Sequence, residues 1–192
     1  MLATYQWYII GAIALVVLLI IIALFNGIIN AENRAKRGWA DVIAYERNKL
    51  KLMPELERLC KGYTSFEGQT QMQITQLRQA IASLDQFDIE PDKLKTVQNL
   101  ASELNKGLQL QVENYPDLKA SNVFQQLMTD WRETQENVTA AISVYNHTVA
   151  LFNDKIQMFP SNAVNGALLK RKVLKPFHDA EAQMSFEYQP NF

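Results

Sequence analysis

The first 31 residues of this chain carry no charged side chain, and all of its charge lies after them. Within this segment, residues 5–29 read YQWYIIGAIALVVLLIIIALFNGII. A helix of roughly 25 residues is about 37 Å long, and a bilayer core needs about 20 apolar residues. The sequence therefore predicts a transmembrane helix over residues 5–29. We expect residues 1–4 to form a short segment outside the membrane.

The flanking residues indicate how this helix is oriented. A cleaved signal peptide is disfavoured, because no Lys or Arg precedes the apolar run and no A-x-A site follows it. Trp7 lies at one end, and such amphipathic rings favour the headgroup level. Arg34, Lys36 and Arg37 follow the other end. The positive-inside rule then places the N-terminus outside and the rest of the chain in the cytoplasm.

Composition limits the size, structural class and partners that the part after the anchor can have. About 160 residues remain, enough for one domain. The net charge is -1, so no overall attraction to nucleic acid is expected. Only 7 Gly and 6 Pro interrupt the chain, which favours helix. The single cysteine, Cys60, excludes an internal disulfide.

The clearest periodicity predicts a long helix from near Ser121 to just before Pro160. Two series of residues seven apart are offset by four, which is the spacing of a coiled-coil seam. One series is Phe124, Trp131, Val138, Tyr145, Phe152 and Phe159, and the other is Met128, Gln135, Ile142, Val149 and Ile156. Gln135 is the polar exception in this seam.

Three further helices are predicted before it. The first continues out of the membrane, is kinked at Pro54 and ends near Gly62. Its seam is Val42, Tyr45, Leu52, Leu56, Leu59 and Tyr63, widened by Trp39 and Met53 and interrupted by Lys49. Two shorter helices are then predicted from stripes of apolar residues, and the second of them begins at Pro91. No strand pattern competes. The expected fold is all-α, with residues 31–160 forming an antiparallel bundle of about four helices.

Residues 161–192 are expected to form a C-terminal tail. In an up-and-down bundle the fourth helix returns toward the membrane, and the tail after it carries Lys170, Arg171, Lys172 and Lys175. Such a basic cluster could bind anionic headgroups. The alternative is a solvated, partly disordered C-terminus. Together with Trp7, Arg34, Lys36 and Arg37, these residues are the candidate membrane-surface residues.

Several short motifs occur in order along the chain. They are Asn33-Arg34, Trp39-Ala40-Asp41-Val42, Leu52-Met53-Pro54-Glu55-Leu56, Lys61-Gly62-Tyr63, Tyr115-Pro116-Asp117-Leu118-Lys119-Ala120, Tyr145-Asn146, Phe152-Asn153 and Phe159-Pro160. With the anchor, they resemble the LemA family of bacterial membrane proteins. The chain departs from the family pattern at Glu55, where Asn is more common. It also lacks the usual Arg cluster before Tyr145.

The resemblance implies a helical bundle on a single-pass anchor in the bacterial inner (cytoplasmic) membrane. It also implies a family without an established enzymatic activity. We therefore expect a non-enzymatic scaffold that self-assembles at that membrane. The alternative is a regulatory adaptor for a membrane protease or envelope-stress system. The expected partners are the bilayer, further copies of the chain and a membrane protein, with no nucleic acid and no small-molecule substrate.

Candidate contact residues come from the seams and from one loop. A polar residue in an apolar seam can fix register or oligomeric state, although it can also be a purely structural exception. The candidates for oligomer or partner contact are Trp39, Lys49, Gln135, Tyr115, Pro116 and Asp117.

No pattern indicates catalysis or a cofactor. The only histidines, His147 and His178, are far apart in sequence, and neither has a second ligand at metal-binding spacing. The chain contains no GxSxG, GxGxxG or P-loop motif. We therefore expect no catalytic residue, no metal and no cofactor.

Overall fold

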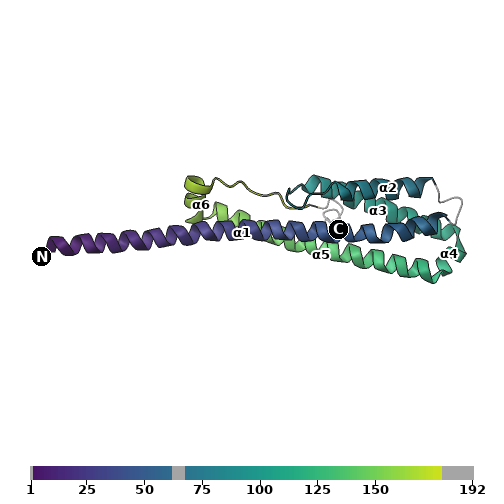
Figure 1. The fold of residues 1–192 in the computed structure, drawn as a ribbon, viewed down its shortest axis with the longest axis horizontal. Coiled ribbons are helices and arrows are strands. Elements are labelled where there is room, and N and C mark those ends of the chain that lie inside the picture. The colour runs from purple at the N-terminus through teal and green to yellow at the C-terminus, as the bar shows by residue number, and fades with distance from the viewer. Residues whose placement is uncertain (1, 62–67, 179–192) are drawn as a thin grey trace, which may run out of the picture. The chain divides into compact units, whose positions relative to one another are not determined.

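A computed structural model describes residues 2–61 and 68–178, and every regular element in these ranges is helical (Figure 1). The elements are α1 (Leu2–Lys61), α2 (Gln69–Ala82), α3 (Pro91–Asn114), α4 (Pro116–Ala120), α5 (Asn122–Gln157), α6 (Ser161–Val164) and the π-helical η1 (Asn165–Leu169). The predicted all-α fold is confirmed. The predicted helix end near Gly62 and the last part of the tail lie outside the described residues.

The chain divides into two compact units. The N-terminal unit comprises Met1–Arg37 and Asn146–Lys175, and the bundle unit comprises Gly38–Tyr145 and Pro176–Phe192. Helices α1 and α5 each contribute one part to either unit. The element bounds and the unit bounds therefore do not coincide.

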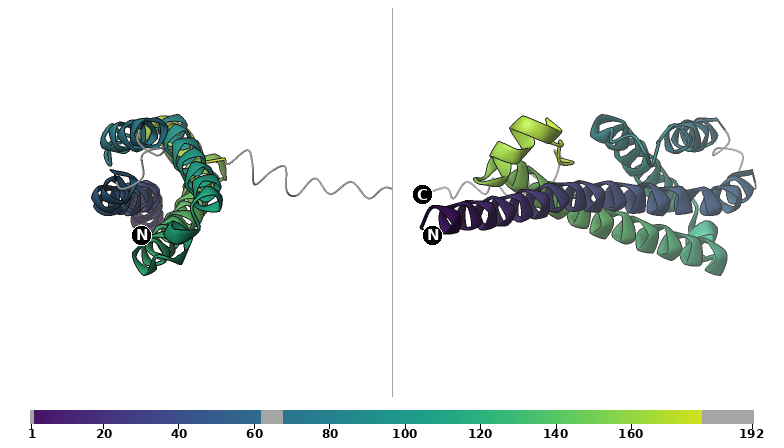
Figure 2. Two further views of the ribbon diagram at one scale, coloured as in Figure 1. Left: turned by 90° about the vertical axis from the view of Figure 1, so that its right-hand side faces the viewer. Right: turned by 60° about the vertical axis from the view of Figure 1, so that its left-hand side comes forward.

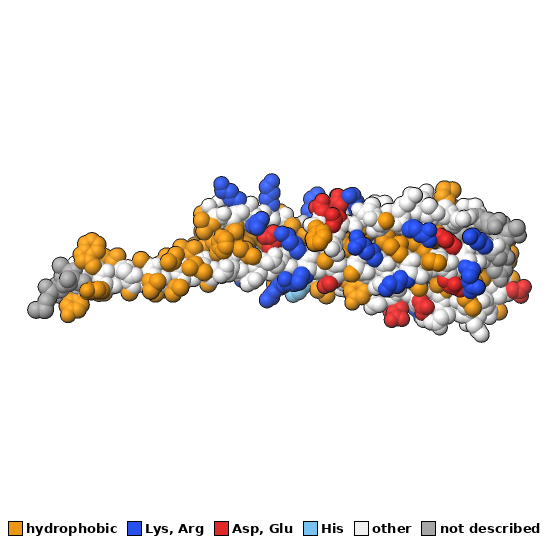
Figure 3. Space-filling model, viewed as in Figure 1, with side chains coloured by type: hydrophobic (Ala, Val, Ile, Leu, Met, Phe, Trp, Pro, Cys, Tyr) orange, Lys and Arg blue, Asp and Glu red, His pale blue; other side chains and the backbone are white. Residues whose placement is uncertain are grey.

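In the N-terminal unit, the apolar part of α1 is largely uncovered. Each residue in the range 5–20 is exposed, and Figure 3 shows hydrophobic side chains along this part of the helix. By length and composition, α1 is long and apolar enough to cross a membrane. This finding supports a membrane anchor at the N-terminus.

The end of the apolar run is covered by the C-terminal part of the same unit. The buried cluster there consists of Ile28, Phe152, Ile156 and Val164, with Leu24, Phe25, Ala31, Leu169 and Leu174 packed against it. Helix α1 thus changes at about Leu24 from an exposed apolar helix to one that is packed on one side.

Two asparagines fix the segment after α6. The Asn153 side chain accepts from the Leu174 amide and donates to the Leu174 carbonyl, both at 2.9 Å. Asn165 makes the same pair of bonds to the backbone of Arg171, at 2.9 and 3.0 Å. After η1 ends at Leu169, the backbone at Arg171 and Leu174 is therefore held by side-chain clamps rather than by further helix.

The bundle unit combines parts of α1 and α5 with α2, α3 and the short α4, and its long helices lie side by side (Figure 2). Glu57 of α1 pairs with Arg78 of α2, while Arg47, which comes earlier in α1, donates to the carbonyl of Leu84 just after the C-terminal end of α2. The order of contacts is reversed, so these two helices run in opposite directions. The Trp39 ring packs on Tyr145 of α5 at 5.4 Å between centroids, and its Nε1 donates to the Asp85 carbonyl at 2.9 Å. Long side chains of α1 therefore tie the bundle together.

Two details of the predicted seams are wrong. Tyr45 is 41% exposed, and its neighbour Glu46 is fully buried instead. Phe159 is 84% exposed because α5 ends at Gln157, two residues before it. The other members of its series are buried: Phe124, Trp131, Val138, Tyr145 and Phe152.

The predicted loop after α3 is a single helical turn, α4. Pro116 occupies its first position, where the missing amide hydrogen has no cost, and Leu118 is buried. The α3 helix itself begins at Pro91, as predicted, for the same reason.

Candidate functional site

The core of the bundle unit contains a buried ion pair. Lys49 Nζ lies 2.9 Å from Glu46 Oε2, and both side chains are fully buried. The two residues are three apart on α1, so they lie on one face of the helix. Within the described residues, neither of these two atoms makes a further hydrogen bond. Each of these two atoms is therefore stabilised only by the opposite charge of its partner.

Burial dominates the electrostatics of this pair. It raises the pKa of Glu46 and lowers the pKa of Lys49, while the attraction between the two charges opposes both shifts. Desolvation penalises the charged form of either group. Because both side chains are closed off from solvent, they cannot act on a dissolved substrate.

Two glutamines extend the pair across the bundle. Gln98 of α3 donates from Nε2 to Glu46 Oε1, and Gln135 of α5 donates from Nε2 to Gln98 Oε1 at 2.7 Å. One chain of polar contacts therefore links α1, α3 and α5. It joins Lys49 and Gln135, the two polar exceptions that the seams single out.

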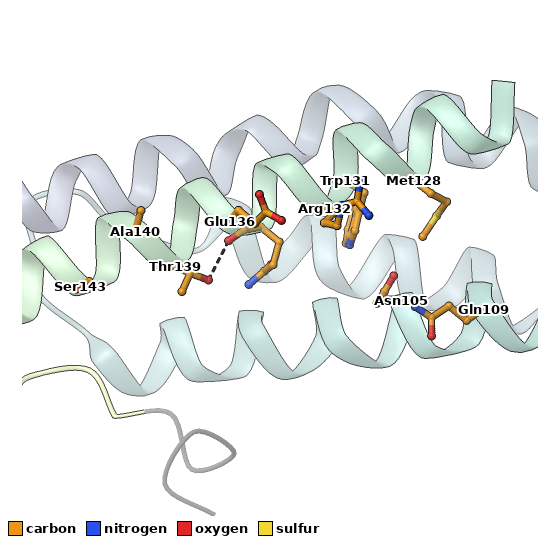
Figure 4. Close-up of a pocket in the computed structure, with 10 residues that line it drawn as sticks. Asn105, Gln109, Met128, Trp131, Arg132, Glu136, Thr139, Ala140 and Ser143 are labelled. Carbon is orange, nitrogen blue, oxygen red and sulfur yellow. Dashed lines mark hydrogen bonds between the residues drawn. The ribbon is translucent and has the colours of Figure 1, made fainter. Parts of the chain in front are cut away.

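The polar chain ends at a groove between α3 and α5 (Figure 4). The groove has a volume of about 660 Å³. Asn105 and Gln109 line it from α3, and from α5 it is lined by Met128, Trp131, Arg132, Gln135, Glu136, Thr139, Ala140 and Ser143. In Figure 4, Asn105 and Gln109 of α3 lie across from Met128 and Trp131 of α5. The Thr139 hydroxyl donates to the Gln135 carbonyl at 3.0 Å, so it is used within its own helix.

The structure separates the predicted contact residues. Trp39 and Lys49 have no exposed surface in the bundle unit, so neither offers a contact surface to another chain in this structure. Packing against three neighbouring helices explains why α1 buries them. Gln135 is half-buried and lines the groove, where a partner can reach it. Pro116 and Asp117 are exposed on α4, and Tyr115 is half-buried.

The predicted membrane-surface residues fall into two groups. Lys36 and Arg171 both pair with Glu32, at 2.7 and 3.0 Å, so this one carboxylate partly offsets two positive charges. The others are exposed: Trp7, Arg34, Arg37, Lys170, Lys172 and Lys175.

Sequence reasoning missed Glu46 and Gln98. Both are polar residues at positions that the helical stripes assign to the core or its border. The available signal was the spacing of Glu46 to Lys49, which suits an ion pair on one helical face. Among the described residues, no group of three or more His, Cys, Asp or Glu side chains is arranged to hold a metal.

Comparison with known proteins identifies relatives of this chain. A family model described as the LemA family matches residues 38–190. A curated relative, Protein LemA of Metamycoplasma hominis, is 29% identical over 139 residues. The match covers 72% of this chain and 62% of that relative, so the chain spans less than two thirds of its length. Neither description specifies an activity.

Proposed function

The chain belongs to the LemA family, and on this premise we propose that it is a membrane-anchored, non-enzymatic scaffold that self-assembles at the bacterial inner membrane. The observation that carries the proposal is the double role of α1. Its first part is an exposed apolar helix, and its last part is a core helix of the bundle unit. Anchoring confines copies to one plane and raises their effective concentration.

The orientation follows from the basic residues after the apolar run. Arg34, Lys36 and Arg37 favour a cytoplasmic location for the bundle unit, with the N-terminus outside. In this arrangement the groove between α3 and α5 is the working surface. It combines amide and charged groups with Met128 beside the largely buried Trp131, a mixture of polar and apolar groups that protein-binding grooves use.

The second candidate is a regulatory adaptor for a membrane protease or envelope-stress system. The same groove supports it, because a helix of another membrane protein could occupy it as well as a second copy could. The two candidates differ in which protein should copurify with this chain from a detergent extract: a second copy or another membrane protein.

A two-tag pull-down separates them. Two differently tagged full-length copies are expressed together, extracted in mild detergent and captured through one tag. Recovery of the second tag supports the scaffold. A chain starting at Ala31 should lose this recovery. Capture of one specific membrane protein, without the second tag, would contradict self-assembly and favour the adaptor.

A groove variant tests the working surface. Ala140 is an exposed lining residue, and Ala140→Arg would fill the groove with a long charged side chain. We expect recovery of the second tag to fall at least fivefold. Ala82→Arg makes the same change at an exposed position of α2 and should leave recovery unchanged. Equal recovery with both variants would exclude the groove as the contact.

A further inference from the structure

We propose that a cavity in the N-terminal unit binds the phosphate headgroup of an anionic phospholipid. The cavity has a volume of about 340 Å³, within the range of small-ligand sites. From α1 it is lined by Gly27, Asn30, Ala31 and Arg34, and from α5 by Thr148, Leu151 and Lys155. The inference rests on the proposed membrane anchor and names a ligand for it.

The spacing along α1 places this cavity at the membrane surface. Trp7 marks one headgroup layer, and Gly27 follows it by roughly 20 residues, or about 30 Å of helix, which is the thickness of a bilayer core. Gly27 through Arg34 then lie in the opposite headgroup layer. The four α1 residues of the cavity share one face because they are three or four positions apart.

The charges in the cavity suit a phosphate. Within the part of the chain that the structure describes, neither Arg34 nor Lys155 forms an ion pair, whereas the nearby Lys36 and Arg171 are both held by Glu32. Arg is suited to bidentate phosphate contacts, and Lys provides a compact positive charge. Asn30 adds an amide at the same wall.

Gly27 allows the lysine to reach the floor of the cavity. A Cβ atom at this position would stand 3.0 Å from Lys155 Cε and 3.1 Å from Nζ. The ammonium therefore lies directly over the α1 backbone. The other end of the site is apolar: Leu151 is 46% exposed at the cavity wall, and the lipid-facing residues of α1, such as Ile22, continue from it. A headgroup in the cavity would leave its acyl chains beside this surface.

Bound lipid can be counted by native mass spectrometry of the full-length protein released from mild detergent. The protein is supplied with dioleoyl phosphatidylglycerol, with dioleoyl phosphatidylcholine, or with soluble glycerol phosphate and inorganic phosphate. We expect retained phosphatidylglycerol and a clear preference over phosphatidylcholine, whose choline would face two cations. Each cation should contribute about fivefold to this preference, so Arg34→Gln with Lys155→Gln should lower it roughly 25-fold.

Lys36→Gln is the matched control. It removes one charge on the same helix within one turn of Arg34, but that charge is already paired with Glu32. We expect it to change the preference less than twofold. The thermal unfolding of each variant, followed by circular dichroism, verifies that the helices are intact.

The outcomes distinguish the cavity from the anchor. No preference in the wild type, or an equal loss in the Lys36→Gln control, would overturn the headgroup site. Displacement of the lipid by millimolar inorganic phosphate would identify a soluble anion as the ligand and would also overturn it. Extraction of the protein from membranes by alkaline carbonate would instead overturn the anchor itself.

Discussion

At the scale of single residues, the Glu46–Lys49 pair is the most unusual feature of the bundle unit. Both charges are removed from water, which costs several kcal/mol for each ion, and their attraction at 2.9 Å offsets that cost. The Gln98 amide satisfies the second carboxylate oxygen. The pair therefore adds little net stability, yet breaking it leaves a buried charge without a partner.

Removing one partner tests this argument. Lys49→Met should lower the free energy of unfolding by about 3–5 kcal/mol, because the Glu46 carboxylate remains buried without its positive partner. Glu46→Leu combined with Lys49→Met should restore stability to within about 1 kcal/mol of the wild type or above it. The measurement is urea unfolding of the full-length protein in mild detergent, followed by circular dichroism at 222 nm.

The partly exposed Glu57–Arg78 pair provides the comparison. Glu57→Gln should change stability by less than about 1 kcal/mol, as for other pairs that remain solvated. If Lys49→Met and the double variant were equally unstable, the cost would come from altered packing and not from the orphaned carboxylate.

The pH dependence of stability should report the buried phenol of Tyr145. Burial raises the pKa of Tyr145 to about 12 from its usual value of 10.0. A raised folded-state pKa means that the stabilisation is complete below pH 10 and is lost as the pH rises through 12. Relative to Tyr145→Phe, the wild type should lose roughly 2–3 kcal/mol between these values. Unfolding of both proteins at pH 9 to 12 measures this, and a constant difference would contradict it.

At the scale of elements, α1 shows what could be predicted and what could not. The apolar run, the start of α3 at Pro91 and the extent of α5 follow from local signals that the structure reproduces. The seam of α1 was predicted only in part, because Glu46 is buried where Tyr45 was expected. Its buried positions step by three and four through a charged pair: Trp39, Val42, Glu46, Lys49, Met53 and Leu56. Hydrophobicity favoured Tyr45 over Glu46, because a carboxylate is stable in a core only when it has partners there, in this case the neighbouring Lys49 and the distant Gln98.

The candidate site was predictable to a similar extent. Gln135 and Lys49 stood out as polar interruptions of apolar seams, and the structure connects them through Gln98. Gln98 itself carries no local signal, since its role depends on the packing of three helices. The groove between α3 and α5 likewise depends on which helices become neighbours, which periodicity within one helix does not specify.

The asparagine clamps determine the path of the chain after α6. Asn153→Ala would remove both side-chain bonds to the Leu174 backbone, each contributing about 1 kcal/mol. We therefore expect hydrogen exchange of the Leu174 amide to accelerate by roughly tenfold or more. Asn162→Ala changes an exposed residue of α6 and should leave this exchange unaffected. Equal protection in both variants would show that the clamp is not what holds the segment.

At the scale of the whole molecule, one helix belongs to both functional parts. The apolar start of α1 is exposed and can face lipid, while its end lies in the core of the bundle unit. In the proposed function the protein works through position and contact, and the buried Glu46–Lys49 pair is closed to dissolved substrates. Its proposed surfaces are the groove, which would receive another protein, and the cavity of the N-terminal unit, which would receive a headgroup.

The most direct test of the central claim is the mass of the particle that the protein forms. Size-exclusion chromatography with light scattering would be applied to the full-length protein in mild detergent and to a chain starting at Ala31. A single chain has a mass of 22.0 kDa. The account predicts a uniform assembly with a protein mass that is a multiple of this value for the full-length protein, and a monomer without the anchor. Monomers in both samples would contradict a self-assembling membrane scaffold.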